Sequence, residues 1–182
     1  MSNENGANAN PPRRIHIVGG PGSGKSYLGR TLAAALGVPV CDLDSLFWDN
    51  DHATYGVRAE PDVRDRKLAE FVAQDGWVVE GVYHAWVGAS FERAEAIVVL
   101  RPGPILRDAR IVRRFLARKL GLERAVKKET LAGLIGLLRW NHGYDNDNLA
   151  RALDALEPYE HKVHAFRSAD AAAAFLLATP EA

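Results

Sequence analysis

Short apolar runs alternate with longer amphipathic stretches along most of this chain of 182 residues. Runs of this kind are typical of strands that are buried on both faces of a parallel sheet. Five strands are predicted, at residues 15–18, 38–42, 77–79, 96–100 and 162–166. Because amphipathic segments separate them, the pattern predicts an α/β fold with helices on both faces of one parallel sheet.

Helices are predicted where apolar side chains recur at helical spacing between these strands, at residues 25–36, 61–74, 105–120, 128–140, about 147–156 and 169–177. The first of them stops at Gly37 and the second begins with Pro61, as helix ends commonly do. No internal repeat or linker divides the chain. We therefore expect one domain over residues 15–180, with a lid or insert region at about 102–158.

Composition limits the classes of partner. Lysine plus arginine and aspartate plus glutamate both number 23, so net charge does not favour nucleic acid, a membrane surface or another polyanion. Cys41 is the single cysteine and cannot form an internal disulfide, which suits a reducing compartment. Residues 1–14 are rich in Asn, Gly, Ala and Pro and contain no apolar signal-peptide core. We expect a disordered tail there and a soluble, cytoplasmic protein.

One segment has a specific chemical meaning, because it matches the phosphate-loop pattern G-x-x-x-x-G-K-[ST] between a predicted strand and a predicted helix. The loop consists of Gly19, Gly20, Pro21, Gly22, Ser23, Gly24, Lys25 and Ser26. Its backbone N–H groups can surround phosphate oxygens at the positive end of the following helix. Lys25 is expected to contact the β- and γ-phosphates, and Ser26 the bound magnesium. Tyr27, the next residue, is included in the predicted nucleotide-binding segment.

The stretch from residue 15 to the loop, Ile-His-Ile-Val-Gly-Gly-Pro-Gly-Ser-Gly-Lys-Ser, resembles the start of the adenylate-kinase and shikimate-kinase group. Residues 42–48, 76–83 and 96–100 resemble a bacterial branch of that group, often labelled topology-modulation proteins. The resemblance extends from about residue 15 to 177. It implies a three-layer P-loop fold with a five-stranded parallel sheet ordered 2-3-1-4-5 and nucleotide at the carboxyl ends of the strands.

Acidic residues follow two of the predicted strands. Asp42 and Asp44 are separated by one residue, so both side chains can point the same way at the sheet edge beside the loop. By resemblance to shikimate kinases, Asp42 would hold a water of the magnesium shell and Asp44 would meet the acceptor hydroxyl. The alternative is that one of the two caps the next helix. Glu80 stands where the related branch carries aspartate, and could serve metal, acceptor or an ordinary turn.

Five arginines crowd the helix predicted at residues 105–120, namely Arg107, Arg110, Arg113, Arg114 and Arg118. Arg110 and Arg114 are four residues apart, with Arg107 one turn earlier on the same side. The segment resembles the lid-entry helix of adenylate kinases, where such a pair serves the base and the transferring phosphate. The resemblance therefore assigns Arg110 and Arg114 to catalysis, and leaves the other three open. The alternative is a solvated basic face.

Other candidates have two interpretations each. Arg58 and Arg64 flank the start of the helix at residues 61–74, where related kinases bind their acceptor, but surface pairs with Glu60 or Asp62 are an equal alternative. Four aromatic residues could stack on an acceptor or fill the core, namely Phe47, Trp48, Tyr83 and Trp86. His161 and His164 lack the further ligands of a zinc site.

These observations predict an enzyme that binds ATP, or another NTP, together with Mg²⁺. It would transfer the γ-phosphoryl group to a small acceptor such as a nucleoside, nucleotide or other hydroxyl compound. The competing class is a nucleotide-binding regulator that hydrolyses slowly and acts as a switch. Neither residues 49–60 nor the insert at 122–159 carries a signature for the acceptor, and the insert could form a lid or a dimer contact. Nucleic-acid and membrane partners are not expected.

Overall fold

The structure is a computed structural model that describes residues 10–49, 56–122 and 130–178. Its central sheet consists of β1 (Arg14–Gly19), β2 (Val40–Asp42), β3 (Trp77–Gly81), β4 (Ala96–Leu100) and β5 (Val163–Phe166). All neighbouring strands pair in parallel, in the order β2-β3-β1-β4-β5. The predicted α/β class and strand order are confirmed. Strand ends differ from the prediction by up to two residues.

The helices are α1 (Lys25–Leu36), α2 (Asp44–Phe47), α3 (Pro61–Val72), α4 (Gly88–Arg93), α5 (Pro104–Lys119), α6 (Leu131–Tyr144), α7 (Asn148–Leu156) and α8 (Ala169–Leu177), with the 3₁₀ helix η1 (Glu157–Lys162) before β5. The short helices α2, α4 and η1 were not predicted, because four to six residues contain too few turns for a helical period to be visible. Helix α6 ends four residues later than predicted.

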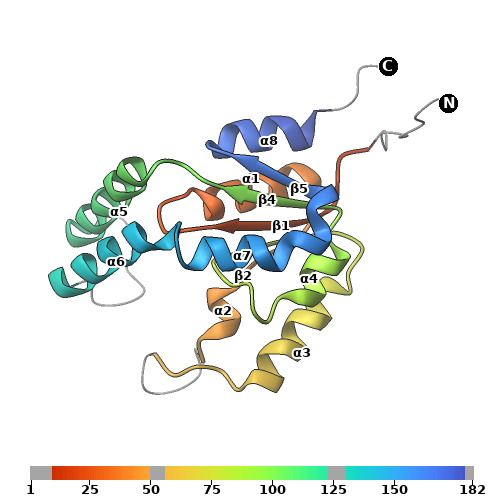
Figure 1. The fold of residues 1–182 in the computed structure, drawn as a ribbon, viewed down its shortest axis with the longest axis horizontal. Helices are drawn as coiled ribbons and strands as arrows, with labels where there is room; N and C mark the ends of the chain where they lie inside the picture. Colours follow the sequence, from red (N-terminus) through yellow and green to blue (C-terminus); the bar gives the residue numbers. More distant parts are fainter. Residues whose placement is uncertain (1–9, 50–55, 123–129, 179–182) are drawn as a thin grey trace.

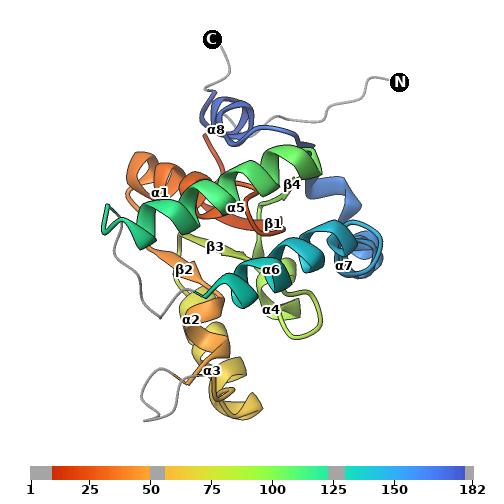
Figure 2. The same ribbon diagram turned by 90° about the vertical axis from the view of Figure 1, so that its left-hand side faces the viewer.

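Side chains on successive strand positions enter two separate cores, one on each face of the sheet. Ile15 and Ile17 of β1 pack under α1 and α8, whereas Val18 belongs to the cluster covered by α3, α4 and α7. Figures 1 and 2 show these helices as two layers with the sheet between them. The strands are apolar throughout because both of their faces are covered.

Helices α5 and α6 belong to neither layer. The β1 arrow in Figure 1 points toward them, and both extend beyond the carboxyl ends of the strands. They pack against each other, and α6 is connected to the layer beneath the sheet through α7 (Figure 2). The chain therefore places two helices directly over the strand edge where the phosphate loop begins.

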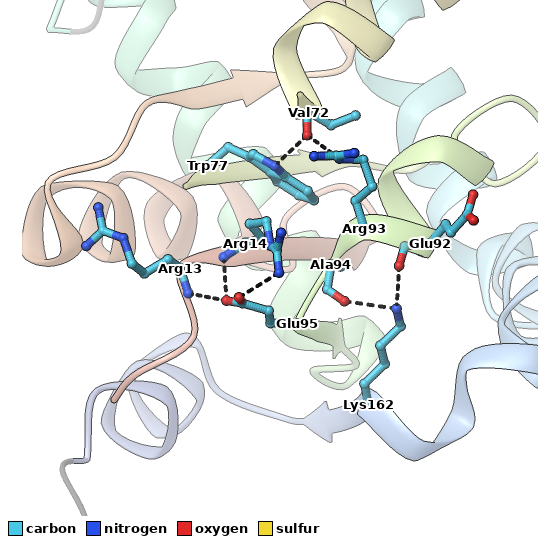
Figure 3. Close-up of polar contacts among 9 residues, drawn as sticks. All are labelled: Arg13, Arg14, Val72, Trp77, Glu92, Arg93, Ala94, Glu95 and Lys162. Carbon is cyan, nitrogen blue, oxygen red and sulfur yellow. Dashed lines mark hydrogen bonds and ion pairs between the residues drawn. The ribbon is translucent and has the colours of Figure 1, made fainter. Parts of the chain in front are cut away.

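The opposite, amino edge of the sheet is closed by ion pairs and hydrogen bonds (Figure 3). Glu95, just before β4, accepts hydrogen bonds from the backbone N–H groups of Arg13 and Arg14 at 2.6 and 3.1 Å. The Arg14 guanidinium adds an ion pair with the same carboxylate at 2.9 Å. This arrangement joins the start of β1 to the start of β4.

Helix α4 is held at the same edge through carbonyl groups near its end. Lys162 donates to the carbonyl oxygens of Glu92 and Ala94, both at 2.9 Å (Figure 3). Arg93 donates to the carbonyl oxygen of Val72, the last residue of α3, at 2.6 Å. Cations are favourable at helix C-termini, because the final carbonyl groups have no intrahelical partner. This edge therefore has a structural role.

Parts of three predictions lie outside the described residues. They are most of the expected tail, the middle of the stretch at residues 49–60 and the start of the insert. Arg14, placed in the tail by the sequence, belongs to β1. Within the described ranges no helix combines the length and apolar character needed to cross a bilayer.

A histidine of β1 points into the core. His16 is fully buried, its Nδ1 is 2.7 Å from the Ser90 hydroxyl, and its ring meets the Phe91 ring at 4.6 Å. Burial lowers the pKa of His16 to about 3, because a charged imidazolium would lose its hydration there. The ring is therefore neutral in the folded protein at physiological pH.

The stability of the fold should consequently decrease on mild acidification. The unfolded chain takes up a proton at His16 below its ordinary pKa of 6.5, while the folded chain does not until about pH 3. The His16 contribution is thus present above pH 6.5 and is lost between pH 6.5 and 3, with about 2 kcal/mol lost by pH 5. Urea unfolding at pH 7 and pH 5 measures this change.

His16→Leu should remove that part of the pH dependence, because leucine does not titrate. His161→Gln is the matched control, since His161 is exposed, and it should keep the wild-type dependence. Equal pH dependence in His16→Leu and the wild type would contradict a neutral, buried His16.

Candidate functional site at the phosphate loop

The predicted loop forms at the carboxyl end of β1 and leads into α1. Gly22 and Gly24 have φ angles of 70° and 98°, in the left-handed region that glycine tolerates. A turn closes between the Ser23 N–H and the Gly20 carbonyl at 3.2 Å. Successive N–H groups in such a turn, followed by a helix N-terminus, form a concave site for an anion. Tyr27 lies in the first turn of α1 and is half exposed.

Two of the loop glycines are also required by close packing. A Cβ at Gly20 would lie 2.8 Å from the Tyr144 ring and 3.2 Å from a guanidinium nitrogen of Arg107. A Cβ at Gly22 would lie 2.5 Å from the Arg107 carbonyl oxygen. Helices α5 and α6 therefore form a wall against the loop, and that wall leaves no space for larger residues.

Lys25 and Glu80 face each other beside the loop. The Lys25 Nζ is 3.8 Å from the Glu80 Oε2, and both side chains are largely buried. Burial raises the pKa of Glu80, while the Lys25 charge and a hydrogen bond from Ser26 oppose that rise. The sequence left Glu80 open between metal, acceptor and turn. The structure places it in β3, one residue before the strand ends and next to Lys25 and Ser26.

Asp42 ends its strand as predicted, whereas Asp44 lies outside the strand. Asp42 is paired with Glu80 across β2 and β3, but Asp44 is the first residue of α2 and not part of the strand. Asp42 Oδ1 accepts a hydrogen bond from the Asp44 N–H at 2.9 Å, a turn that aspartate commonly makes before a helix. The alternation argument was therefore wrong for Asp44, and the alternative of a helix-start contact holds for Asp42.

Asp44 has a side-chain partner that the sequence did not predict. The Tyr83 hydroxyl, in the segment after β3, donates to Asp44 Oδ1 at 2.7 Å. Burial and this hydrogen bond raise the pKa of Tyr83, so the phenol stays protonated as a donor. The Tyr83 ring stacks on Phe47 at 4.7 Å. Asp44 is thereby held at the rim of an aromatic cluster.

The arginines near α3 contact aromatic rings. Arg58 lies over the Phe47 ring at 5.4 Å, and Arg64 over the Trp86 ring at 4.3 Å. Arg64 also forms an ion pair at 2.8 Å with Asp65, instead of the Glu60 or Asp62 partners considered from the sequence. The aromatic residues thus pack on one another and on cations, and the arginines line the same side of the site as Asp44.

The α5 arginines lie in three different surroundings. Arg110 donates to the carbonyl oxygens of Gly22 and Ser23 at 3.2 and 3.1 Å, so it contacts the loop directly. Arg113 and Arg114 are exposed. Arg107, expected on the same basic face, is instead buried and forms an ion pair with Asp145 at 2.7 Å. The sequence left the role of Arg107 open, and the alternative of a solvated basic face does not hold for it, because α6 covers that side of α5.

The side chains beside the loop can be compared with the ligands that a magnesium-bound nucleotide requires. Magnesium prefers oxygen ligands and retains waters, so it needs few protein groups when phosphates supply the rest. Within the described ranges, no three His, Cys, Asp or Glu side chains could enclose a metal by themselves. Ser26 and Glu80 stand beside the loop, and the buried Glu80 Oε2 has no hydrogen-bond partner among the described residues. This arrangement fits a cation shared with phosphate.

Sequence reasoning did not identify three neighbours of the candidate site residues, Tyr83, Tyr144 and Asp145. Tyr83 was considered only for stacking on an acceptor or for filling the core. A signal existed for Tyr83, since it follows β3 at the carboxyl edge of the sheet. No local signal existed for Tyr144 and Asp145, because more than 100 residues separate them from the loop.

Comparison with known sequences finds a kinase that is similar to part of this chain. No protein-family model matches the chain. Shikimate kinase 2 of Sodalis glossinidius (strain morsitans) is 29% identical over 104 residues, which are 57% of this chain and 51% of the relative. The chain thus matches about half the length of that curated relative.

Among solved structures, a gluconokinase from Sinorhizobium meliloti 1021 superposes with a TM-score of 0.51 at 19% identity, covering 92% of this chain and 91% of the gluconokinase. A shikimate kinase from Bacteroides thetaiotaomicron gives a TM-score of 0.47 at 19% identity over 85% of each chain. The gluconokinase match establishes that the chain has the fold of P-loop kinases.

The tight contact at Gly22 leads to a prediction about stability. Gly22→Ala and Gly37→Ala both place alanine at a positive φ angle, which costs about 1 kcal/mol. Only Gly22→Ala also forces a methyl group against a backbone oxygen, which costs about 2 kcal/mol more. A Cβ at Gly37 meets nothing within 4 Å. Urea unfolding of both variants should show this difference, and equal losses would contradict the close wall at Gly22.

Proposed function

We propose that this protein is a phosphotransferase that moves the γ-phosphoryl group of ATP, bound with Mg²⁺, to the hydroxyl group of a small acceptor. The proposal rests on one observation: Asp44, Glu80 and the phosphate loop all lie at the carboxyl edge of the sheet. A nucleotide-binding switch needs only to hold phosphates and place a water, whereas a kinase must also orient a hydroxyl. Asp44 beside an aromatic cluster suits that second task.

Phosphate binding is assigned to residues 19–26. The loop N–H groups and the α1 N-terminus would hold the phosphate oxygens, and Lys25 would place a point charge on the β- and γ-phosphates. Bound magnesium would offset the phosphate charge, with Ser26 as a direct ligand and with Glu80 and Asp42 reached through its waters. Charge stabilisation of this kind is the main catalytic contribution expected at such a site.

Asp44 is proposed to accept a hydrogen bond from the acceptor hydroxyl. A carboxylate has two oxygens with several lone pairs, so the bond from Tyr83 orients Asp44 and leaves it able to accept another. The guanidinium groups of Arg58 and Arg64 lie on the aromatic cluster beside Asp44 and would guide the acceptor. The names of the similar proteins, shikimate kinase and gluconokinase, support acceptors that carry several hydroxyl groups.

Arg110 and Arg114 are proposed to act on the nucleotide from α5. Arg110 already reaches the loop through the Gly22 and Ser23 carbonyl groups, and Arg114 lies one turn further along the same helix. Guanidinium groups suit both stacking on a base and bidentate binding of phosphate. The segments at residues 15–26, 42–48, 76–83 and 96–100, which resemble the topology-modulation branch, also support membership of that branch of these kinases.

Lys25→Met should weaken ATP·Mg binding by about 30-fold or more, because the removal of one partner of a buried charge contact costs about 2 kcal/mol. Titration calorimetry with ATP·Mg measures the affinity, and circular dichroism verifies the fold. Lys67→Met, on the exposed side of α3, is the matched control and should bind as the wild type does. Wild-type affinity in Lys25→Met would refute the assignment of the loop.

The acceptor can be found by measuring ADP release from ATP·Mg in the presence of nucleosides, nucleotides, sugars and hydroxy acids. With the acceptor found, Asp44→Asn should keep ATP·Mg affinity but lose acceptor-stimulated turnover by on the order of 100-fold, since an amide cannot take the hydroxyl proton. Asp42→Asn should instead raise the magnesium concentration needed for turnover. Glu70→Gln, exposed on α3, is the control.

Two results would change these assignments. Loss of ATP·Mg binding in Asp44→Asn would reassign that carboxylate to the metal. ADP release that no acceptor stimulates would replace the kinase with the nucleotide-binding regulator.

A further inference from the structure

An ion pair between a buried guanidinium and a partly exposed carboxylate joins α5 to the end of α6 behind the phosphate loop. Arg107 contacts both carboxylate oxygens of Asp145, with Nη1 at 2.7 Å from Oδ1 and Nη2 at 2.9 Å from Oδ2. Arg107 is 1% exposed, and its Nη2 also approaches the Asn141 carbonyl oxygen at 3.4 Å. Two parallel bonds fix the plane of the guanidinium as well as its position.

The same arginine is in contact with the loop. Its guanidinium and the Tyr144 ring form the wall at Gly20, and its carbonyl oxygen forms the wall at Gly22. Tyr144 is fully buried, and its ring lies 5.6 Å from the Arg107 guanidinium. Burial raises the pKa of Tyr144, so this wall is uncharged on the tyrosine side. Any shift of α6 relative to α5 would therefore reach the loop.

The energetics of such a pair suggest a role beyond holding the helices together. Removal of the Arg107 guanidinium from water costs several kcal/mol, while Asp145 stays 38% exposed, and apolar residues of similar volume often stabilise a protein as well as or better than a buried charge with its partner. A second polar contact, from the Asn141 amide to Asp108 Oδ1 at 2.7 Å, already joins the two helices without contact to the loop. The Arg107 pair differs from it mainly in reaching the loop.

We propose that Arg107 is a positioning residue for the phosphate loop, oriented by Asp145 and supported by Tyr144. The pair holds the α5–α6 wall against Gly20 and Gly22, so the loop keeps the shape that phosphates require before they bind. Because Arg110 lies on the same helix and bonds to the Gly22 and Ser23 carbonyl groups, the pair also sets the distance of Arg110 from the loop. This inference rests on the proposed nucleotide-binding function.

The test replaces the pair with apolar residues of similar size. Arg107→Met combined with Asp145→Leu removes both charges together and leaves neither ion without its partner. Asp108→Asn is the matched control, since it weakens the other contact between the helices. Three quantities are compared with the wild type: the free energy of unfolding in urea, the affinity for ATP·Mg by calorimetry, and amide hydrogen exchange of residues 19–26 without nucleotide.

The double variant should unfold at a urea concentration close to that of the wild type, yet bind ATP·Mg at least about tenfold more weakly, which corresponds to about 1.4 kcal/mol. Its loop amides should exchange faster than those of the wild type even without nucleotide. Asp108→Asn should lose stability but keep both the affinity and the slow loop exchange.

A double variant with wild-type affinity and wild-type loop exchange would overturn the proposal and leave the pair a structural contact. The single variant Arg107→Met is expected to be less stable than the double variant, because it leaves Asp145 without its partner. Failure of the wild type to bind ATP·Mg would instead refute the proposed function. The exchange measurement still decides the role of Arg107 in that case, because it needs no nucleotide.

Discussion

The parallel register of β2, β3 and β1 is the constraint on which the candidate site depends. Asp42 is paired with Glu80, and Glu80 with Ile17, two residues before the phosphate loop. Because parallel strands end at the same edge, this pairing brings the carboxylates level with Lys25. The hydrogen bonds of the sheet interior thus set the geometry of groups that themselves make few contacts with one another.

Charged side chains are more deeply buried at the carboxyl edge of the sheet than at the amino edge. Glu80 and Arg107 are 2% and 1% exposed and are opposed by Lys25 and Asp145, respectively. Their partners are more exposed, since the Asp145 side chain is 38% exposed. At the amino edge, both members of the Arg14–Glu95 pair are about one-third exposed, and an exposed pair costs little to form. The buried charged groups of the described residues, Glu80 and Arg107, therefore both lie beside the phosphate loop.

Sequence patterns were sufficient for the strands, the longer helices and the phosphate loop, because each of these rests on residues that are close together in the chain. Buried strands read as short apolar runs, and the loop glycines, Lys25 and Ser26 form one contiguous motif. The strand order came from resemblance. The short helix that begins at Asp44 was missed, since four residues show no helical period, and the expectation that Asp42 and Asp44 lie on one strand failed with it.

The sequence by itself determined the class of the fold and the residues of the phosphate loop. Only the tertiary structure decided which side chains surround that loop. Arg107 belongs to a run of arginines that resembles a solvated face, and it is buried because α6, the next helix along the chain, packs over it. Tyr83 reaches Asp44 across 39 residues, and Asp145 reaches Arg107 across 38. Local patterns carry no information about such contacts, because they arise only when separate elements pack.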